Sequence, residues 1–195
     1  YEYYLQYTRA RVLVCDAATG ERLNTPEPII TATAFSADGR SIFTMDPLGT
    51  VVLRSALTGN PEARFAGTGM ADSALFAVVG ARMAVSRMVP FASTAGEQLE
   101  WWDTAKGERL WTSKPRKGEP RAVAISSDGR FVASCVEGHV TLWESSGRLL
   151  HDIPIGKARA VSFSPDGGLI AVAEQEGVVR LLAVAPGREL WRPGY

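Results

Sequence analysis

Apolar and polar residues alternate in short runs along most of the chain, and residues typical of turns separate the runs. The clearest case is the segment 160–173, where Val161 and Phe163 alternate with smaller residues, and Pro-Asp-Gly then precedes a second apolar run. Alternation with a period of two is typical of a half-buried β-strand, and Pro-Asp-Gly favours a tight turn. The segment therefore predicts a β-hairpin.

Degenerate copies of this hairpin recur upstream at 33–39, 74–80 and 123–129. A second kind of apolar run occurs five times, and its copies end at positions 16, 55, 103, 144 and 183, which are 39, 48, 41 and 39 residues apart. A period of about 40 residues built from short strands is the spacing of propeller blades. We therefore expect an all-β fold, a β-propeller of four-stranded antiparallel blades.

The turns divide the chain into one partial and four complete blades, which cover about 1–28, 29–70, 71–118, 119–156 and 157–195. The partial blade has strand-like runs at about 2–7, 11–16 and 21–25 but lacks the strand that opens each later blade, so we expect Tyr1 to lie inside a blade. Because a propeller closes into a ring to protect its end sheets, we expect a single propeller segment from the C-terminal part of a larger, about seven-bladed ring. Completion of the ring by another subunit is the alternative.

The third blade is about eight residues longer than the others, and the excess lies between Ser86 and Gln98. We expect an extended loop there in place of a short turn, and loops on a rigid scaffold often carry function. Its large apolar side chains are those of Met88, Val89 and Phe91. Because such side chains are costly to leave in water, they either fold back onto the blade or meet a partner.

The combination of Phe-Ser-Pro-Asp-Gly, a short β run, a further turn and a run ending in Trp-Asp resembles the WD40 family of β-propellers, in a degenerate, bacterial-type form. Trp102 and Asp103 form the only intact copy of the namesake dipeptide, and the family's Gly-His pair ahead of the first strand is missing from every repeat. The resemblance implies that Asp38, Asp128 and Asp166 hold tight turns by accepting hydrogen bonds from nearby backbone N–H groups. It also implies a non-catalytic interaction module, a scaffold or a sensor-regulatory domain.

A competing resemblance runs through the segments 16–23, 103–111 and 187–191, which are similar to the Thr-Gly…Leu-Trp segments of quinoprotein-type propellers. Those enzymes bind a quinone cofactor, usually with a metal ion, so a propeller enzyme of the quinoprotein class is one alternative function. A purely architectural segment of a large assembly is another. The Phe-Ser-x-Asp-Gly turns favour the WD40 resemblance.

Charge and cysteine content narrow the classes of partner. Lys plus Arg and Asp plus Glu both number 21, so we expect neither nucleic acid nor a membrane surface as the partner. No apolar run is long enough for a transmembrane helix.

Cys15 and Cys135 lie in different blades without the spacing of a metal site. We therefore expect both to be small buried hydrophobes, and we expect the protein to lie in a reducing, cytoplasmic compartment.

The sequence contains none of the common catalytic motifs, such as a Gly-rich phosphate loop or a nucleophile elbow. His139, expected in a hairpin turn, and His151, expected in an outer strand, are read as ordinary solvated or packed side chains. We therefore predict no catalytic residue, no cofactor and no metal, and hence no enzyme. The positions of the tryptophans follow the alternation of the expected strands, so we expect these residues to pack between sheets. They are Trp101, Trp102, Trp111, Trp143 and Trp191.

In a propeller, the loops that enter the first strand and the turns between the second and third strands open on one face, where we place the partner site. Its basic members are Lys114, Arg116, Lys117, Arg121, Lys157 and Arg159. Its acidic members, expected in exposed turns, are Glu137, Glu174 and Glu176. Arg121 and Arg159 stand just before equivalent first strands, so we expect them to lie close together.

A rim of mixed charge beside the apolar residues 88–91 is typical of a protein or peptide site. The partner would be a separate protein, a peptide or another domain of the same full-length protein. Ordinary pairing of arginine and glutamate at the surface is the alternative interpretation. A metal or acid–base role for the three glutamates is disfavoured, because no histidine or aspartate joins them at a fixed spacing.

Overall fold

The computed structural model describes residues 14–15, 19, 22–24, 30, 32–46, 49–65, 74–91, 94–185 and 189–191. All regular elements in these residues are β-strands, so the expected all-β class is confirmed. No helix that could cross a membrane is found in this part of the chain. The chain divides into two compact units, residues 1–67 and residues 68–195.

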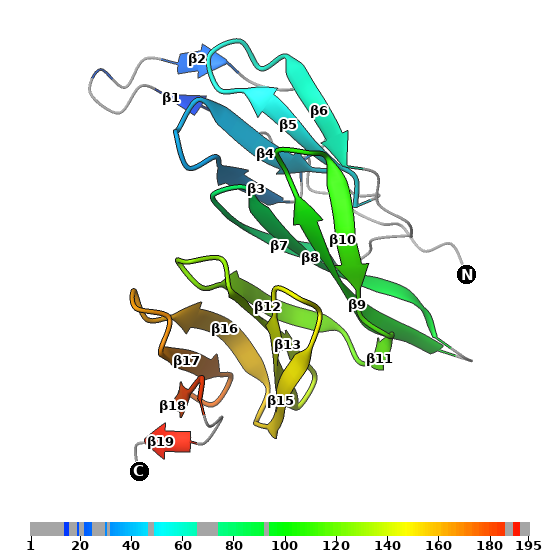
Figure 1. Ribbon diagram of the computed structural model, residues 1–195, viewed down its shortest axis with the longest axis vertical. Coiled ribbons are helices and arrows are strands. Elements are labelled where there is room, and N and C mark those ends of the chain that lie inside the picture. Colours follow the sequence, from blue (N-terminus) through cyan, green and yellow to red (C-terminus); the bar gives the residue numbers. More distant parts are fainter. Residues whose placement is uncertain are drawn as a thin grey trace. The chain divides into compact units, whose positions relative to one another are not determined.

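The first unit contains a two-stranded and a four-stranded antiparallel sheet (Figure 1). The small sheet pairs β1 (Val14–Cys15) with β2 (Arg22–Asn24), which fall in two of the runs expected for the partial blade. The remaining run, at 2–7, lies outside the described residues. The larger sheet is a meander of β3 (Ala32–Phe35), β4 (Ser41–Met45), β5 (Val51–Ser55) and β6 (Pro61–Phe65).

The second unit contains three antiparallel sheets whose strands follow one another in chain order (Figure 1). The first has β7 (Ala74–Val79), β8 (Arg82–Phe91), β9 (Thr94–Asp103) and β10 (Glu108–Thr112), with the short β11 (Arg116–Lys117) paired to β9. The second has β12 (Pro120–Ile125), β13 (Phe131–Val136), β14 (His139–Glu144) and β15 (Leu149–Pro154). The third has β16 (Ala158–Phe163), β17 (Leu169–Glu174), β18 (Val179–Ala183) and β19 (Glu189–Trp191). Together with the meander of the first unit, these sheets show the four-stranded antiparallel form expected of propeller blades.

Neighbouring sheets of the second unit pack through buried apolar side chains. Strand β12 contacts both β7 and β16, so the first strands of the three sheets lie side by side. One apolar cluster joins Leu99 and Trp101 of the first sheet to Val132 of the second. Another joins Leu142 of the second sheet to Leu182 of the third. Because both faces of a blade are covered in this way, its central strands consist largely of apolar residues.

Cys135 lies in the second of these clusters and is fully buried, as the sequence predicts for a small hydrophobe. Burial, with a smaller contribution from the negative charge of Glu97, raises the pKa of its thiol to about 12. The thiol therefore stays protonated and unreactive at neutral pH. The side chain of Cys15 lies outside the described part of the chain.

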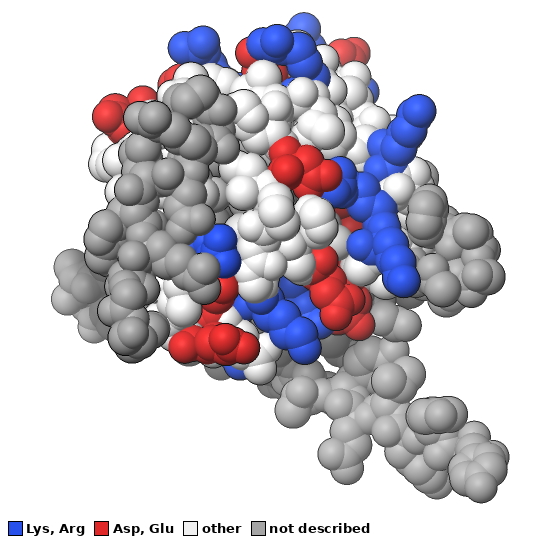
Figure 2. Space-filling view, turned by 90° about the horizontal axis from the view of Figure 1, so that it is seen from below, with Lys and Arg blue, Asp and Glu red and all other residues white. Residues whose placement is uncertain are grey.

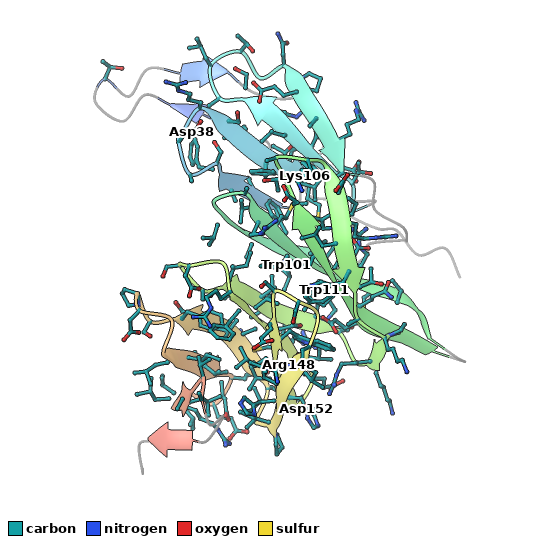
Figure 3. The ribbon with its side chains drawn as sticks, in the orientation of Figure 1. Asp38, Trp101, Lys106, Trp111, Arg148 and Asp152 are labelled. Carbon is teal, nitrogen blue, oxygen red and sulfur yellow. The ribbon has the colours of Figure 1, made fainter. Side chains whose placement is uncertain are left out.

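Three tryptophans form a ladder between the first and second sheets, which confirms their expected packing role. The ring centroids of Trp101 and Trp111, both labelled in Figure 3, are 6.1 Å apart, and those of Trp111 and Trp143 are 5.7 Å apart; both pairs are stacked. The Trp111 indole N–H donates a hydrogen bond of 2.9 Å to the carbonyl of Ser145 in the next sheet. Trp102 is buried on the opposite side of β9, and the side chain of Trp191 is outside the described residues.

An extended loop is expected between Ser86 and Gln98, but the described residues of this segment, 87–91 and 94–97, continue β8 and β9. Both strands are ten residues long and pair from Arg82 with Asp103 to Phe91 with Thr94. The prediction of an extended loop was therefore wrong. The physical reason is that pairing satisfies the backbone N–H and C=O groups, which a long loop would leave to water. The extra length of this repeat is a longer hairpin.

The turn aspartates hold the first hairpin of three sheets, as the WD40 resemblance implies. In the second sheet of the second unit, the Asp128 carboxylate accepts hydrogen bonds from the Ser126 hydroxyl at 2.6 Å and from the Arg130 N–H at 3.0 Å. The serine bond, followed by the backbone bond, lowers the pKa of Asp128. Asp38 and Asp166 accept equivalent bonds and have lowered pKa values for the same reasons.

Candidate interaction face

Strand pairing places the entry to each first strand beside the turn between the second and third strands. At the start of β12, Pro120 pairs with Val136 at the end of β13, and Ala158 pairs with Glu174 in the same way in the next sheet. These segments therefore lie at one end of their sheets. We define the loop face as the residues 113–121, 136–139, 155–159 and 174–178.

Arg121 and Arg159 occupy the same place in neighbouring sheets, and each is the extra residue of a β-bulge. Pro120 pairs with Val136 and Ala122 with Cys135, so Arg121 is skipped by the ladder. Arg159 is skipped in the same way, between Ala158 and Ala160. A bulge of this kind re-aims a side chain and is common beside functional sites. The arginines lie inside β12 and β16, and not before these strands as expected.

Two neighbouring hollows are both lined by Arg121 and Arg159, so these side chains lie close together, as their equivalent positions predict. The first hollow, of about 280 Å³, is also lined by Lys157, Ala158 and Gln175. The second, of about 270 Å³, has an apolar lining from the first strands of all three sheets. Its apolar lining residues are Leu75, Phe76, Ala122, Val123, Ala160 and Val161.

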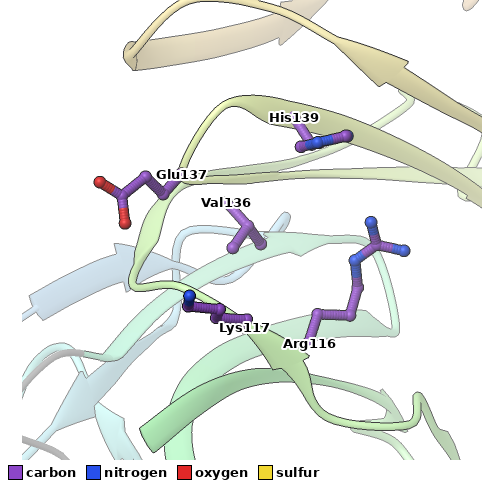
Figure 4. Close-up of a pocket in the computed structure, with 5 residues that line it drawn as sticks. All are labelled: Arg116, Lys117, Val136, Glu137 and His139. Atoms are coloured by element: carbon purple, nitrogen blue, oxygen red, sulfur yellow. The ribbon is translucent and has the colours of Figure 1, made fainter. Parts of the chain in front are cut away.

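A third hollow of about 340 Å³ lies between β11 and the turn that joins β13 to β14 (Figure 4). Its lining residues are Arg116, Lys117, Val136, Glu137 and His139. Gly118 follows Lys117 and lies against Val136: its φ of +116° and the short distance of 2.8 Å from an added Cβ to the Val136 side chain both require glycine. The third hollow and the first share one equivalent lining position, because Glu137 follows the end of β13 as Gln175 follows the end of β17.

Asp152 of β15 links β11 to the second sheet beside this third hollow. One oxygen of the Asp152 carboxylate (labelled in Figure 3) accepts a hydrogen bond from Arg116 at 2.6 Å, and the other lies 3.0 Å from Nδ1 of His139. Partial burial of Asp152 opposes its ionisation. The hydrogen bond and positive charge of Arg116, together with the contact to His139, outweigh it, so the pKa of Asp152 lies below its usual value. Arg116 is therefore engaged within the protein.

The remaining charged members of the predicted site differ in how accessible they are. Lys114, Lys117, Glu137 and Glu176 are exposed on the loop face, and Lys157 is exposed just before β16. Arg121 forms an ion pair with Glu119 at 3.0 Å, with side chains 45% and 54% exposed. An ion pair so open to water contributes little, about 0 to 1 kcal/mol, and is easily exchanged for another partner.

Glu174 does not lie in an exposed turn as predicted. It is the last residue of β17, is buried, and forms an ion pair with Arg180 of β18. Its carboxylate also lies directly against Gly156 in the connection that leads into β16. Glu174 is therefore a buried residue of the loop face that contacts Arg180 and Gly156. The expectation that it presents a solvated carboxylate was wrong.

The apolar residues of the long hairpin are likewise less accessible than the expected loop would have made them. Val89 is buried and Met88 is partly buried, and both lie in β8. Phe91 is the last residue of β8, and its side chain is outside the described part of the structure. The hairpin is thus an extension of the first sheet in which the described apolar side chains, those of Met88 and Val89, are partly or fully buried. Their contact with a partner stays a prediction.

A buried carboxylate lies beneath β11, between the first and second sheets. Glu97 is 1% exposed and accepts hydrogen bonds of 2.7 Å from the hydroxyls of Ser86 and Ser134, which come from the two sheets. Burial raises its pKa, and the serine bonds and the charge of Arg116 only partly offset this effect. Among the described residues no group of three His, Cys, Asp or Glu side chains is arranged to hold a metal ion.

Sequence reasoning missed several residues of this face. Asp152, Gln175, Leu75 and Phe76 line or support the hollows but carry no motif of their own. Their repeat position is the one signal that could have found them. Leu75 and Phe76 lie in the strand that opens its repeat, as Arg121 does, and Gln175 follows the last residue of a second strand, as Glu137 does.

Comparison with known proteins agrees with this architecture. Residues 109–144 match the family model of the WD domain, G-beta repeat (WD40). The match begins in β10 and ends with β14, so the sequence repeat joins the outer strand of one sheet to three strands of the next. Telomerase protein component 1 of Mus musculus is 26% identical over 170 residues, which are 84% of this chain but 6% of that protein. This chain therefore contains a WD40 repeat at residues 109–144, whose strands belong to two neighbouring sheets with the four-stranded antiparallel form of propeller blades.

Proposed function

We propose that this chain is a non-catalytic interaction module that docks a protein or peptide partner on the loop face, as a scaffold or a sensor-regulatory segment. WD40 repeats generally mediate protein–protein interactions, and WD40 domains are generally non-catalytic. The proposal goes further, because it assigns docking to one end of three sheets. The partner is a separate protein or another domain of the full-length chain.

The main observation in support of this proposal is the β-bulge that recurs at Arg121 and Arg159. A bulge costs ladder hydrogen bonds, yet it occurs at the same arginine position in two neighbouring sheets. Both arginines border two adjacent hollows. A hollow of side-chain size with charged groups at its rim is the form of a peptide or protein docking site.

The distribution of charge favours a protein partner over nucleic acid. Blue and red side chains are interspersed on the face shown in Figure 2, without a surface of a single sign. The whole chain has a formal net charge of zero. Nucleic-acid binding requires a continuous basic surface to neutralise phosphates, whereas protein interfaces use charges of both signs for orientation.

The test compares two double variants with the same change in charge. The site variant carries Arg121→Glu with Arg159→Glu, and the control carries Lys106→Glu with Arg130→Glu, two exposed residues in turns at the opposite end of the sheets. Each immobilised chain is incubated with an extract of the source organism, and captured proteins are identified by mass spectrometry. We expect proteins captured by the parent and the control to be lost from the site variant. Equal capture by all three, with unchanged circular dichroism, would contradict docking on the loop face.

A further inference from the structure

Three cations converge on the hollow between the second and third sheets. Arg121, Lys157 and Arg159 line it together with the neutral side chain of Gln175. Among the described residues, Lys157 and Arg159 form no ion pair with a carboxylate, and Arg121 pairs with the exposed Glu119 alone. The hollow therefore has an excess of positive charge that the protein itself leaves largely unneutralised.

This local excess of positive charge contrasts with the chain's formal net charge of zero. Cations that are not paired internally repel one another, and holding two arginines and a lysine around one hollow costs electrostatic free energy. The bulges at Arg121 and Arg159 bring this arrangement about in both sheets, at the expense of ladder pairing. A bound anionic group would relieve the repulsion and be oriented by the planar guanidinium groups.

The adjoining hollow has a different character. Apart from the two arginines, its lining is apolar and comes from three strands: Leu75 and Phe76 in β7, Val123 in β12 and Val161 in β16. These side chains are all partly exposed. With a volume of about 270 Å³, the hollow suits one or two aliphatic side chains, which would gain free energy by leaving water.

From these two adjoining hollows we propose that the partner segment is an acidic peptide with interspersed apolar residues. Its carboxylates bind Arg121, Lys157 and Arg159, and a neighbouring aliphatic side chain enters the hollow beside Phe76. This proposal rests on the proposed function and names the partner's chemistry. The occupant is an internal acidic stretch of a protein, because both hollows lie side by side and require carboxylate and apolar groups on the same segment.

Charged groups near the site favour an acidic segment over a basic one. Glu119 is the carboxylate paired with a cation of the first hollow, and Glu174 beneath it is already neutralised by Arg180. In the third hollow, Arg116 is bound by Asp152, so that hollow offers Lys117 as its accessible cation beside the carboxylate of Glu137. The strongest positive site is therefore the one that contains both bulged arginines.

The experiment uses three short fluorescent peptides of equal length. The probe has the central sequence Glu-Leu-Glu-Glu-Leu-Glu, a second peptide replaces each Glu by Gln, and a third replaces each Leu by Ser. Binding to the intact chain is measured by fluorescence anisotropy at low and moderate salt. A single-stranded oligonucleotide of matching charge is the fourth ligand.

We expect the Glu-Leu probe to bind most tightly and to weaken as salt rises. Arg121→Gln with Arg159→Gln should weaken it about tenfold, or about 1.4 kcal/mol, which divides into about 0.7 kcal/mol for each lost charge pair and lies within the range for exposed pairs. The matched control, Lys106→Gln with Arg130→Gln, should leave it unchanged. Phe76→Ala should weaken the Glu-Leu probe more than the Glu-Ser peptide, because only the former fills the apolar hollow.

Each other result overturns the inference in its own way. Equal binding of the Gln-Leu peptide, or probe binding that survives loss of both arginines, excludes carboxylate recognition at this site. Tighter binding of the oligonucleotide assigns the cations to nucleic acid. If no peptide binds while extract proteins are still captured in an arginine-dependent way, the acidic partner is refuted and docking on the loop face stands. If arginine-dependent capture fails as well, the proposed function fails with it.

Discussion

Replacing Trp111 tests how neighbouring sheets are held in register. Its ring stacks between Trp101 of its own sheet and Trp143 of the next, and its N–H reaches the carbonyl of Ser145. The ring also lies against Gly147, where an added Cβ would approach it to 3.1 Å. Trp111→Ala therefore removes one hydrogen bond and two aromatic contacts at a boundary between sheets.

The expected magnitude follows from these contacts. The hydrogen bond is worth about 1 kcal/mol, and each stacked pair contributes about 0.5 to 1.5 kcal/mol. The three contacts together give a loss of about 3 kcal/mol for Trp111→Ala, at the lower end of the range for a buried tryptophan because Trp111 is partly exposed. Trp111→Phe keeps most of the stacking and loses the indole N–H, so about 1 kcal/mol is expected.

The free energy of unfolding is measured by urea denaturation followed by circular dichroism, which does not depend on the fluorescence of the replaced indole. Leu110→Ala is the control, because Leu110 lies on the same strand and is 45% exposed. A double-mutant cycle with Trp143→Ala should show coupling between the two rings. The reasoning is refuted if Trp111→Ala costs no more than Leu110→Ala, or if Trp111 and Trp143 are additive.

Two further predictions concern buried polar groups. Burial raises the pKa of Glu97 in the folded chain, so the stability this group contributes is fully present below its unfolded pKa of about 4.5 and is lost as pH rises through the higher folded value. Glu97→Gln should therefore gain stability relative to the parent as pH rises from about 4 to 8 in urea titrations, and a constant difference would contradict this. Ser126→Ala removes the hydroxyl that accepts the Phe131 N–H at 2.9 Å and should cost about 1 to 3 kcal/mol. The exposed Ser162→Ala is its control, and equal losses from the two changes would show that the buried turn bond is unimportant.

The local elements of this protein could be predicted from the sequence because they depend on neighbours along the chain. The alternation around Val161 and Phe163 and the turn at Asp166 specify a hairpin without reference to any distant residue. The period of about 40 residues then implies repeated sheets, and the equivalence of Arg121 and Arg159 follows from that period.

The exposure and partners of individual side chains were decided by contacts between sheets, which local sequence patterns do not contain. Glu174 looks like a turn glutamate, yet Arg180 and the close approach of Gly156 bury it. The segment 87–97 reads as a loop because it lengthens the repeat, but pairing along two ten-residue strands satisfies its backbone better than water does in a compact sheet.

The sequence by itself therefore determined that this chain folds as repeated four-stranded sheets, since strand and turn preferences are local and the repeat multiplies them. Only the tertiary structure decided that two arginines are turned out by matching bulges, which cations remain unpaired, and that apolar residues of three first strands meet beside them. The physical reason is that burial and charge pairing depend on which strands become neighbours in space, and residues as far apart in the sequence as Leu75 and Val161 meet only once the sheets have packed.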